Sequence, residues 1–300
     1  MNSTVAIIGT GWVGSSVAIS TLHSGVANEL LLHDQRTAVA EGEAMDLAQG
    51  AAFYPTAAVR VATIAEMMQA DAIVITAGRA GVPGQSRLDL LRGNAEIITE
   101  LGQQLVGYAG IIVMVTNPVD VLTRLMVHAS GLPPQRVIGT GTMLDTARFK
   151  QRMGLELHVD PHSVHGQVVG EHGDSEVVLW SGVRIGSTPL ATWPGWNCSS
   201  EASIADDVRT AAEKIIQRKG CTNHAIGLVT ADLLRCVLRD ERGVLTVSRV
   251  QADGVAYSMP AIVGRAGVIA VLEPEMNDAE REKLAHSAAV LREAYQGIEP

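Results

Sequence analysis

Short apolar runs alternate with amphipathic segments of helix length through the first half of the chain. The apolar runs lie at residues 5–8, 30–32, 59–62, 72–76, 111–116 and 137–139. Strands that read as continuous apolar runs are buried on both faces, so the pattern predicts a parallel sheet covered by helices on both sides. Six such strands are typical of a doubly wound α/β domain.

The pattern changes at about residue 143. A helix is predicted at 143–153, and a β-rich stretch at 159–185 leads into a loop with proline and tryptophan at 189–196. The remaining predicted elements are a helical segment at 200–239 interrupted at Gly220, strands near 244–250 and 259–263, and a final helix at 278–295. We therefore predict a Rossmann nucleotide-binding domain at 1–141 and an α+β substrate-binding domain at 142–300.

Composition narrows the functional classes. The chain has 300 residues, of which 47% are hydrophobic, and this is enough apolar material for large cores. A net charge of −9 and an aromatic content of 3% favour neither a nucleic-acid footprint nor a base-stacking platform. No apolar run approaches the roughly 20 residues needed to cross a bilayer, and no charged leader precedes the first strand. We therefore expect a cytoplasmic protein with no membrane partner, whose three scattered cysteines are reduced thiols.

A glycine motif, GTGWVG, follows the first predicted strand directly. In such a motif Gly9 makes the tight turn, Gly11 lets the backbone approach a pyrophosphate, and Gly14 lets the helix pack on the strand. Asp34 ends the second strand about twenty residues later, where a carboxylate can accept hydrogen bonds from both ribose hydroxyls and repel a 2′-phosphate. The sequence therefore predicts NAD rather than NADP as the cofactor.

Three further segments carry residues suited to chemistry. The segment TNPVD at 116–120 ends the fifth strand, at the sheet edge where ligands of such folds bind. The segment LDTAR at 144–148 places Asp145 and Arg148 on one face of a helix. The segment GEHGD at 170–174 places His172 between two glycines, Gly170 and Gly173, where little side-chain bulk would crowd a substrate.

These motifs, together with the RLDLL that follows Gly84, occur in the order found in the L-lactate/L-malate dehydrogenase family, and the chain resembles that family over nearly its whole length. The resemblance implies that His172 is the proton donor and acceptor and that Asp145 is its carboxylate partner. It also implies that Arg148 binds the substrate carboxylate, that Arg87 is the arginine of a closing loop, and that Asn117 lies near the substrate and the nicotinamide. Further cofactor contacts implied are Trp12, Val13, Thr76, Ala77, Gly78, Asn94 and Val115, and a further substrate contact is Thr222.

The residue types suit the oxidation of a secondary alcohol. The cofactor takes a hydride, and a base with a pKa near neutrality takes the proton, which is the role that histidine fills. The planar fork of Arg148 matches a carboxylate. The glycine-rich stretch at 77–84 can bend, so Arg87 can come over the substrate and polarise its C2 carbonyl where negative charge develops.

The substrate side chain is predicted from the same loop. In the resembled family the residue six before the loop arginine faces the substituent on C2. Here that residue is Gly81, followed by Val82, which leaves space and adds apolar surface. We therefore predict pyruvate or a larger apolar 2-keto acid. The alternative is a malate dehydrogenase in which Arg79 pairs with the second carboxylate.

Other readings of the chain remain. NAD-dependent glycosidases share this architecture but use a metal, and a non-catalytic NAD-binding regulator would also keep the fold. The histidine-rich stretch LHVDPHSVH superficially suggests a metal site, but we interpret it as structural and expect no metal.

Lys150 and His165 align with basic positions that bind fructose 1,6-bisphosphate in some bacterial lactate dehydrogenases, although one of them is usually arginine. The resemblance also implies a homo-oligomer, a tetramer or else a dimer.

Overall fold

The first half of the chain alternates strand and helix as predicted. The structure is a computed structural model that describes residues 3–79 and 87–298. The elements of this half are β1 (Thr4–Ile8), α1 (Trp12–Ser24), β2 (Glu29–His33), α2 (Thr37–Gln49), β3 (Ala58–Val61), α3 (Ile64–Met67), β4 (Ala72–Ile75), α4 (Arg87–Gln104), β5 (Ile111–Met114), α5 (Val119–Ser130) and β6 (Val137–Gly139). All six predicted strands are confirmed, with ends that differ by one or two residues.

The six strands form a parallel sheet in the order β3-β2-β1-β4-β5-β6. The order reverses between β1 and β4, which is the switch point at which ligands of doubly wound sheets bind. Alternate residues of each strand enter different cores: Val5 and Ile7 point to one face, and Ala6 and Ile8 to the other. This explains why the strands read as continuous apolar runs.

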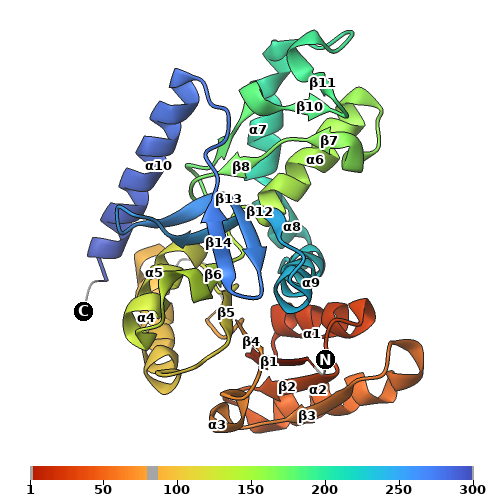
Figure 1. Cartoon of the computed structure of the whole chain (residues 1–300), viewed down its shortest axis with the longest axis vertical. Coiled ribbons are helices and arrows are strands. Elements are labelled where there is room, and N and C mark those ends of the chain that lie inside the picture. Colours follow the sequence, from red (N-terminus) through yellow and green to blue (C-terminus); the bar gives the residue numbers. More distant parts are fainter. Residues whose placement is uncertain (1–2, 80–86, 299–300) are drawn as a thin grey trace.

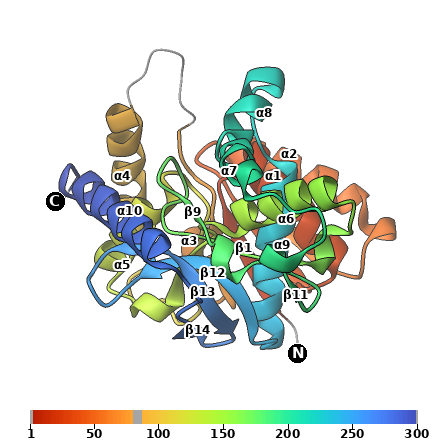
Figure 2. The ribbon, with the colours of Figure 1, turned by 90° about the horizontal axis from the view of Figure 1, so that it is seen from above.

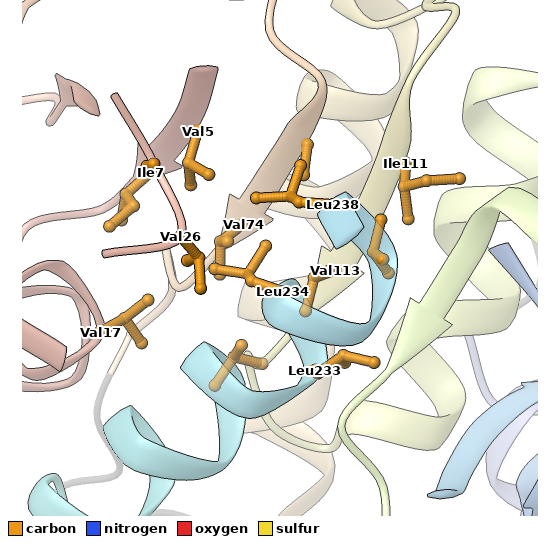
Figure 3. Packing of buried hydrophobic residues seen from close by; sticks show 14 of the residues in the cluster. Val5, Ile7, Val17, Val26, Val74, Ile111, Val113, Leu233, Leu234 and Leu238 are labelled. Carbon is orange, nitrogen blue, oxygen red and sulfur yellow. The ribbon is translucent and has the colours of Figure 1, made fainter. Parts of the chain in front are cut away.

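Helices from both halves of the chain cover the two faces of this sheet. One face packs against α1, α2 and α9 (His224–Arg239). Figure 3 shows Leu234 of α9 beside Val74 of β4, in the cluster that also holds Val17 of α1 and Val5 of β1. The other face packs against α3, α4, α5 and α10 (Asp278–Gln296), the long helix that ends near the C-terminus in Figure 1. Two helices of the predicted second domain therefore complete the layers of the first.

The second half contains two small sheets, four helices between residues 143 and 239, and a β-meander followed by α10. Its helices are α6 (Met143–Leu157), α7 (Glu201–Arg209), α8 (Ala211–Lys219) and α9; its strands are β7 (Val164–His165), β8 (Val168–Val169), β9 (Val177–Val178), β10 (Arg184–Ile185), β11 (Thr188–Pro189), β12 (Gly243–Val250), β13 (Ala256–Gly264) and β14 (Gly267–Val271). The predicted break at Gly220 is present, where this glycine caps α8 with a φ of 85°. A second break at Thr210 and the strand β14 were not predicted.

The meander joins the parallel sheet instead of standing apart from it. Strand β12 pairs antiparallel with β6 through Ser248 and Gly139, which gives one mixed sheet in the order β14-β13-β12-β6-β5-β4-β1-β2-β3. Figure 2, seen from above, shows β12 to β14 beside α9. In the part of the chain that the structure describes, no helix is both long enough and apolar enough to cross a membrane.

Candidate active site

The predicted motifs meet at the carboxyl edge of the parallel sheet. The glycine turn leaves β1, the segment at 76–79 leaves β4, the segment at 115–118 leaves β5, and α6 begins a few residues after β6. These four strands are neighbours in the order β6-β5-β4-β1, so their ends lie side by side. The sheet thus brings together segments that are more than a hundred residues apart in sequence.

The glycine turn has the backbone that the motif predicts. Gly9 has a φ of 101°, and a Cβ there would lie 2.5 Å from the backbone nitrogen of Ala77, so only glycine fits between the two loops. A Cβ on Gly14 would collide with the carbonyl oxygen of Gly9. A Cβ on Gly11, in contrast, would meet nothing within 4 Å. The turn is therefore tightly packed on the protein side and open at Gly11, where a pyrophosphate would approach.

Asp34 lies at the end of β2, next to this turn. Its carboxylate accepts hydrogen bonds from the backbone nitrogens of Thr10 and Arg36, each at 2.9 Å. Burial acts to raise the pKa of Asp34, but these hydrogen bonds and the charge of Arg36 outweigh it and lower the pKa. The group is thus an anion fixed at the place predicted for the ribose.

The loops after β1, β4 and β5 are joined by partly buried hydrogen bonds. Thr76 donates its hydroxyl to the carbonyl oxygen of Gly9 at 2.6 Å. Asn94 accepts from the backbone nitrogen of Arg79 at 2.7 Å and donates to the carbonyl oxygen of Asn117 at 2.9 Å. Asn94 is only 2% exposed, and its side chain holds these loops together.

A cavity of about 830 Å³ runs along these loops. Among the residues predicted to contact the cofactor, it is lined by Gly9, Gly11, Asp34, Thr76, Ala77 and Gly78. Trp12 is largely exposed at the start of α1, whereas the side chains of Val13 and Val115 pack into the core beneath. Any contact of Val13 and Val115 with the cofactor would therefore come from their backbone atoms.

His172, Asp145 and Arg148 form one connected group. The Nδ1 of His172 lies 2.5 Å from Oδ2 of Asp145, and an Arg148 guanidinium nitrogen lies 2.8 Å from the other oxygen, Oδ1. Asp145 has a side chain only 2% exposed, whereas the His172 side chain is 22% exposed. An ionised Asp145 can only accept, so Nδ1 of His172 is the donor and Nε2 remains for a substrate.

The charges in this group favour the imidazolium form. Burial acts to lower the pKa of His172, but the charge of Asp145 and its hydrogen bond prevail and raise the pKa to about 9. Burial likewise acts to raise the pKa of Asp145, but His172 and Arg148 lower it. His172 is therefore a proton donor at neutral pH, which suits the reduction of a carbonyl.

Two carboxylates beside His172 were not predicted. Asp120, which is 2% exposed at the start of α5, accepts from the backbone nitrogen of His172 at 2.7 Å and so fixes the loop that carries the imidazole. Burial raises the pKa of Asp120 to about 6, although this hydrogen bond acts in the opposite direction. The only sequence signal was its place in the TNPVD motif, which does not reveal its partner.

Glu176 is the second of these carboxylates, four residues after His172. Its Oε1 is buried and makes no hydrogen bond to any residue that the structure describes. Burial and then the charge of Asp145 raise the pKa of Glu176 to about 8. The acidic residue just after GEHGD was visible in the sequence, but nothing there indicated that it turns inward.

The structure does not describe the side chains of some of the predicted site residues. Gly81 and Val82 lie outside the described residues. Arg87 is the first residue of α4, but its side chain also lies outside the description. Their assigned roles in loop closure and substrate choice therefore stay predictions.

A second cavity, of about 660 Å³, adjoins Arg148. Arg148 and Thr222 both line it, and its walls include the apolar side chains of Leu144, Val208 and Ile226. It lies between α6, α7, α8 and the start of α9. The predicted substrate contacts Arg148 and Thr222 are thus brought together beside apolar surface.

The remaining basic candidates lie elsewhere. Lys150 and His165 line a third cavity, of about 910 Å³, together with His162, and burial lowers the pKa of Lys150. His162 pairs with Asp160 at 2.7 Å, and both side chains are well exposed. Within residues 3–79 and 87–298 no three histidine, cysteine or acidic side chains converge in a way that could hold a metal ion.

Comparison with known proteins agrees with this geometry. Residues 3–139 match the family model of the lactate/malate dehydrogenase NAD-binding domain, and residues 142–299 match that of the lactate/malate dehydrogenase α/β C-terminal domain. The chain is 42% identical to "L-lactate dehydrogenase 2" of Enterococcus faecalis, over 100% of this chain and 98% of the relative. It is 40% identical to "L-lactate dehydrogenase" of a Synechococcus species, over 98% of each chain. The crystal structure of the minor L-lactate dehydrogenase of Enterococcus mundtii superposes with a TM-score of 0.96 at 38% identity, covering 99% of both chains.

Proposed function

Because the chain belongs to the lactate/malate dehydrogenase family, we propose that it is an NAD-dependent L-lactate dehydrogenase that interconverts pyruvate, or a larger apolar 2-keto acid, and the L-2-hydroxy acid. The observation that supports this most directly is the connected group of His172, Asp145 and Arg148 beside the carboxyl edge of the sheet. A histidine able to donate a proton and a guanidinium able to bind a carboxylate thus lie on one adjoining loop and one helix.

The residues present fit NAD. The open side of the glycine turn at Gly11 and the anionic Asp34 border the same cavity of about 830 Å³, so they suit a pyrophosphate and a ribose. When bound, NAD accepts a hydride at its nicotinamide ring and NADH donates one. We propose that the cofactor-binding residues are Gly9, Gly11, Trp12, Val13, Gly14, Asp34, Thr76, Ala77, Gly78, Asn94, Val115 and Asn117.

His172 is the proposed proton donor in keto-acid reduction. The Asp145 carboxylate holds the Nδ1 proton, so the proton on Nε2 passes to the substrate oxygen as hydride reaches C2. In the reverse direction the neutral imidazole takes the hydroxyl proton. Asp120 holds the backbone of His172 and keeps the ring in line with the substrate.

Arg148 and the closing loop position the substrate. The guanidinium of Arg148 keeps one edge on Asp145 and offers a planar fork to the substrate carboxylate. Thr222 faces the same cavity and contacts the substrate there. Arg87 stabilises the charge on the C2 oxygen, and Asn117 borders both substrate and nicotinamide.

The apolar walls of the 660 Å³ cavity support an uncharged side chain. A second substrate carboxylate placed against Leu144, Val208 and Ile226 would be desolvated. The cations that also line the cavity are engaged already: Arg152 and Lys214 pair with Asp207, and Lys219 donates to Asn223. The malate alternative is not favoured by the comparisons either. The guanidinium of Arg79 lies against α4, 3.3 Å from where a Cβ of Gly93 would be, and lines the cofactor cavity instead. We propose that Gly81 and Val82 contact the uncharged side chain of the substrate when the loop closes.

We propose a homo-oligomer, most simply a tetramer, located in the cytoplasm. Large apolar side chains that a monomer leaves in water support assembly, among them Ile19, Met45 and Phe53 of the first domain and Leu228 and Val244 beside the 910 Å³ cavity. Lys150 and His165 in that cavity are the proposed phosphate-binding residues of an allosteric site.

We also propose that residues 1–141 and 142–300 are the NAD-binding domain and the substrate-binding domain.

One assay tests the proposed function. NADH consumption is measured with pyruvate, 2-ketobutyrate, 2-ketoisocaproate and oxaloacetate, each with and without a chelator. We expect turnover of the three uncharged 2-keto acids, little turnover of oxaloacetate and no effect of the chelator. Preference for oxaloacetate would contradict the proposed substrate class, and loss of activity with chelator would favour metal-dependent chemistry.

A further inference from the structure

A cavity of about 810 Å³ lies at the opposite edge of the sheet from the active site. It is bordered by the segments that enter β4, β5 and β6, which include Asp71, Gly110 and Gln135. The end of α9 and the turn between β13 and β14 close its other side. Since the group of His172, Asp145 and Arg148 lies at the carboxyl ends of these same parallel strands, the cavity is separate from the proposed active site.

The floor of this cavity is apolar. It includes Ile111 of β5, Val237 and Leu238 of α9, and Val268 of β14, all of which are buried. Figure 3 shows Ile111 and Leu238 in the packed layer between α9 and the sheet. A planar or apolar group could therefore rest on the floor without further rearrangement of the core.

Three arginines line the same cavity. Arg136, at the end of a short 3₁₀ turn (Pro134–Arg136), is half-buried, and its guanidinium makes no hydrogen bond or ion pair with the described part of the chain. Arg249 of β12 is half-buried too; its Nε donates to the carbonyl oxygen of Val250 at 3.0 Å. Arg265 is exposed, and one of its guanidinium nitrogens donates to the carbonyl oxygen of Leu238 at 2.8 Å.

The guanidinium groups of Arg136 and Arg249 have no acidic partner in the described part of the chain, whereas Arg265 lies beside Asp240, whose pKa its charge lowers. Burial lowers the pKa of Arg249, and no acidic group offsets that effect. Apart from Asp71, whose carboxylate accepts from the backbone nitrogen of Thr4 at 2.9 Å, the lining carries no acidic side chain. The lining thus has a formal charge of +2, in a chain whose net charge is −9. A half-buried guanidinium without an anion is unfavourable unless a ligand supplies one.

We propose that this cavity binds a small polyanion, with phosphate or carboxylate groups on Arg136, Arg249 and Arg265 and an apolar or planar body on the floor. Arginine forks match both kinds of oxyanion bidentately. The cavity volume lies in the range of small-molecule sites, which is about 300–1,000 Å³. Such a ligand would bind independently of the 2-keto acid, because it occupies the other edge of the sheet.

Calorimetric titration tests this site with three probes: pyrophosphate, citrate and AMP. The protein carries Lys150→Gln and His165→Gln, which remove the other candidate phosphate-binding residues, and is saturated with NADH to fill the cofactor site. We expect at least one probe to bind, and Arg249→Gln or Arg136→Gln to weaken that binding by about tenfold or more, as for loss of a charged hydrogen bond. Arg292→Gln is the matched control, because Arg292 is a surface arginine that pairs with Asp253 and does not line the cavity, and it should leave the affinity unchanged.

The pattern of probes identifies the ligand chemistry. Binding of pyrophosphate and AMP without citrate supports a phosphate ligand, and binding of citrate supports a carboxylate ligand. Each variant should keep the pyruvate kcat of the parent, which shows that it is folded. No binding by any probe, or binding that neither arginine variant weakens, overturns the proposal. A change of oligomeric state in the arginine variants also overturns it, because the cavity would then be an interface between subunits.

Discussion

Replacing Asp145 by asparagine should move the pH dependence of catalysis by several pH units. Asparagine has the same shape and keeps an oxygen that can accept from Nδ1 of His172, but it carries no charge. The carboxylate raises the pKa of His172 from 6.5 to about 9, against the effect of burial. Without that charge, burial and the charge of Arg148 lower the pKa of His172 and only Asp120 still raises it, so in Asp145→Asn the pKa should fall below 6.5.

The magnitude follows from that difference. At about 1.36 kcal/mol for each pH unit, the shift from 6.5 to about 9 corresponds to roughly 3.4 kcal/mol in favour of the imidazolium. At pH 7.5 nearly all of the parent enzyme is protonated at His172, whereas in the variant less than about a tenth would be. Pyruvate reduction at pH 7.5 should therefore fall at least about tenfold from protonation alone, and further if Arg148 is misplaced.

The assay is kcat/KM for pyruvate reduction and lactate oxidation between pH 5 and pH 10. In the parent, reduction should decline and oxidation should rise as the pH passes about 9; in the variant both transitions should move below pH 6.5. Asp160→Asn is the control, since its carboxylate pairs with the exposed His162. A variant that keeps its transition near pH 9 would refute the assignment of the charge effect to Asp145.

The same shift has a consequence for folding. Because the folded-state pKa of His172 is raised, the stabilisation is fully present below pH 6.5 and is lost as the pH rises through about 9. The parent should therefore lose a few kcal/mol of unfolding free energy between pH 6.5 and pH 9, and Asp145→Asn should lose much less over the same range. Urea unfolding at several pH values measures this difference.

Three further changes test other parts of the site. Asp34→Ser should reduce the preference for NADH over NADPH in kcat/KM, and equal use of both cofactors by the parent would contradict the ribose assignment. Arg148→Lys should raise the KM for pyruvate about tenfold or more, because a bidentate contact becomes a single one; an unchanged KM would place the substrate carboxylate elsewhere. Glu176→Gln should increase the unfolding free energy at pH 9, since it removes a buried group whose pKa is raised to about 8 and which is charged there; no gain in stability would mean that Glu176 is solvated.

The sequence by itself determined the parallel sheet and the chemical groups. Apolar runs bounded by helix-length segments predicted β1 to β6, because a strand that is buried on both faces consists of consecutive apolar residues. The glycine turn with Asp34 was predicted because that motif needs its residue types at a regular spacing. The pairing of His172 with Asp145, and the place of Arg148, came from the resemblance to a known family.

The tertiary structure alone decided which elements became neighbours. Strand β12 pairs with β6, and α9 and α10 complete the layers of the first domain, since an apolar face does not specify the surface that will cover it. Asp120 and Glu176 reach His172, and Arg136, Arg249 and Arg265 share one cavity, across separations that no local pattern records. Local periodicity reflects whether a side chain is buried, whereas its partner is set by long-range packing of the whole chain.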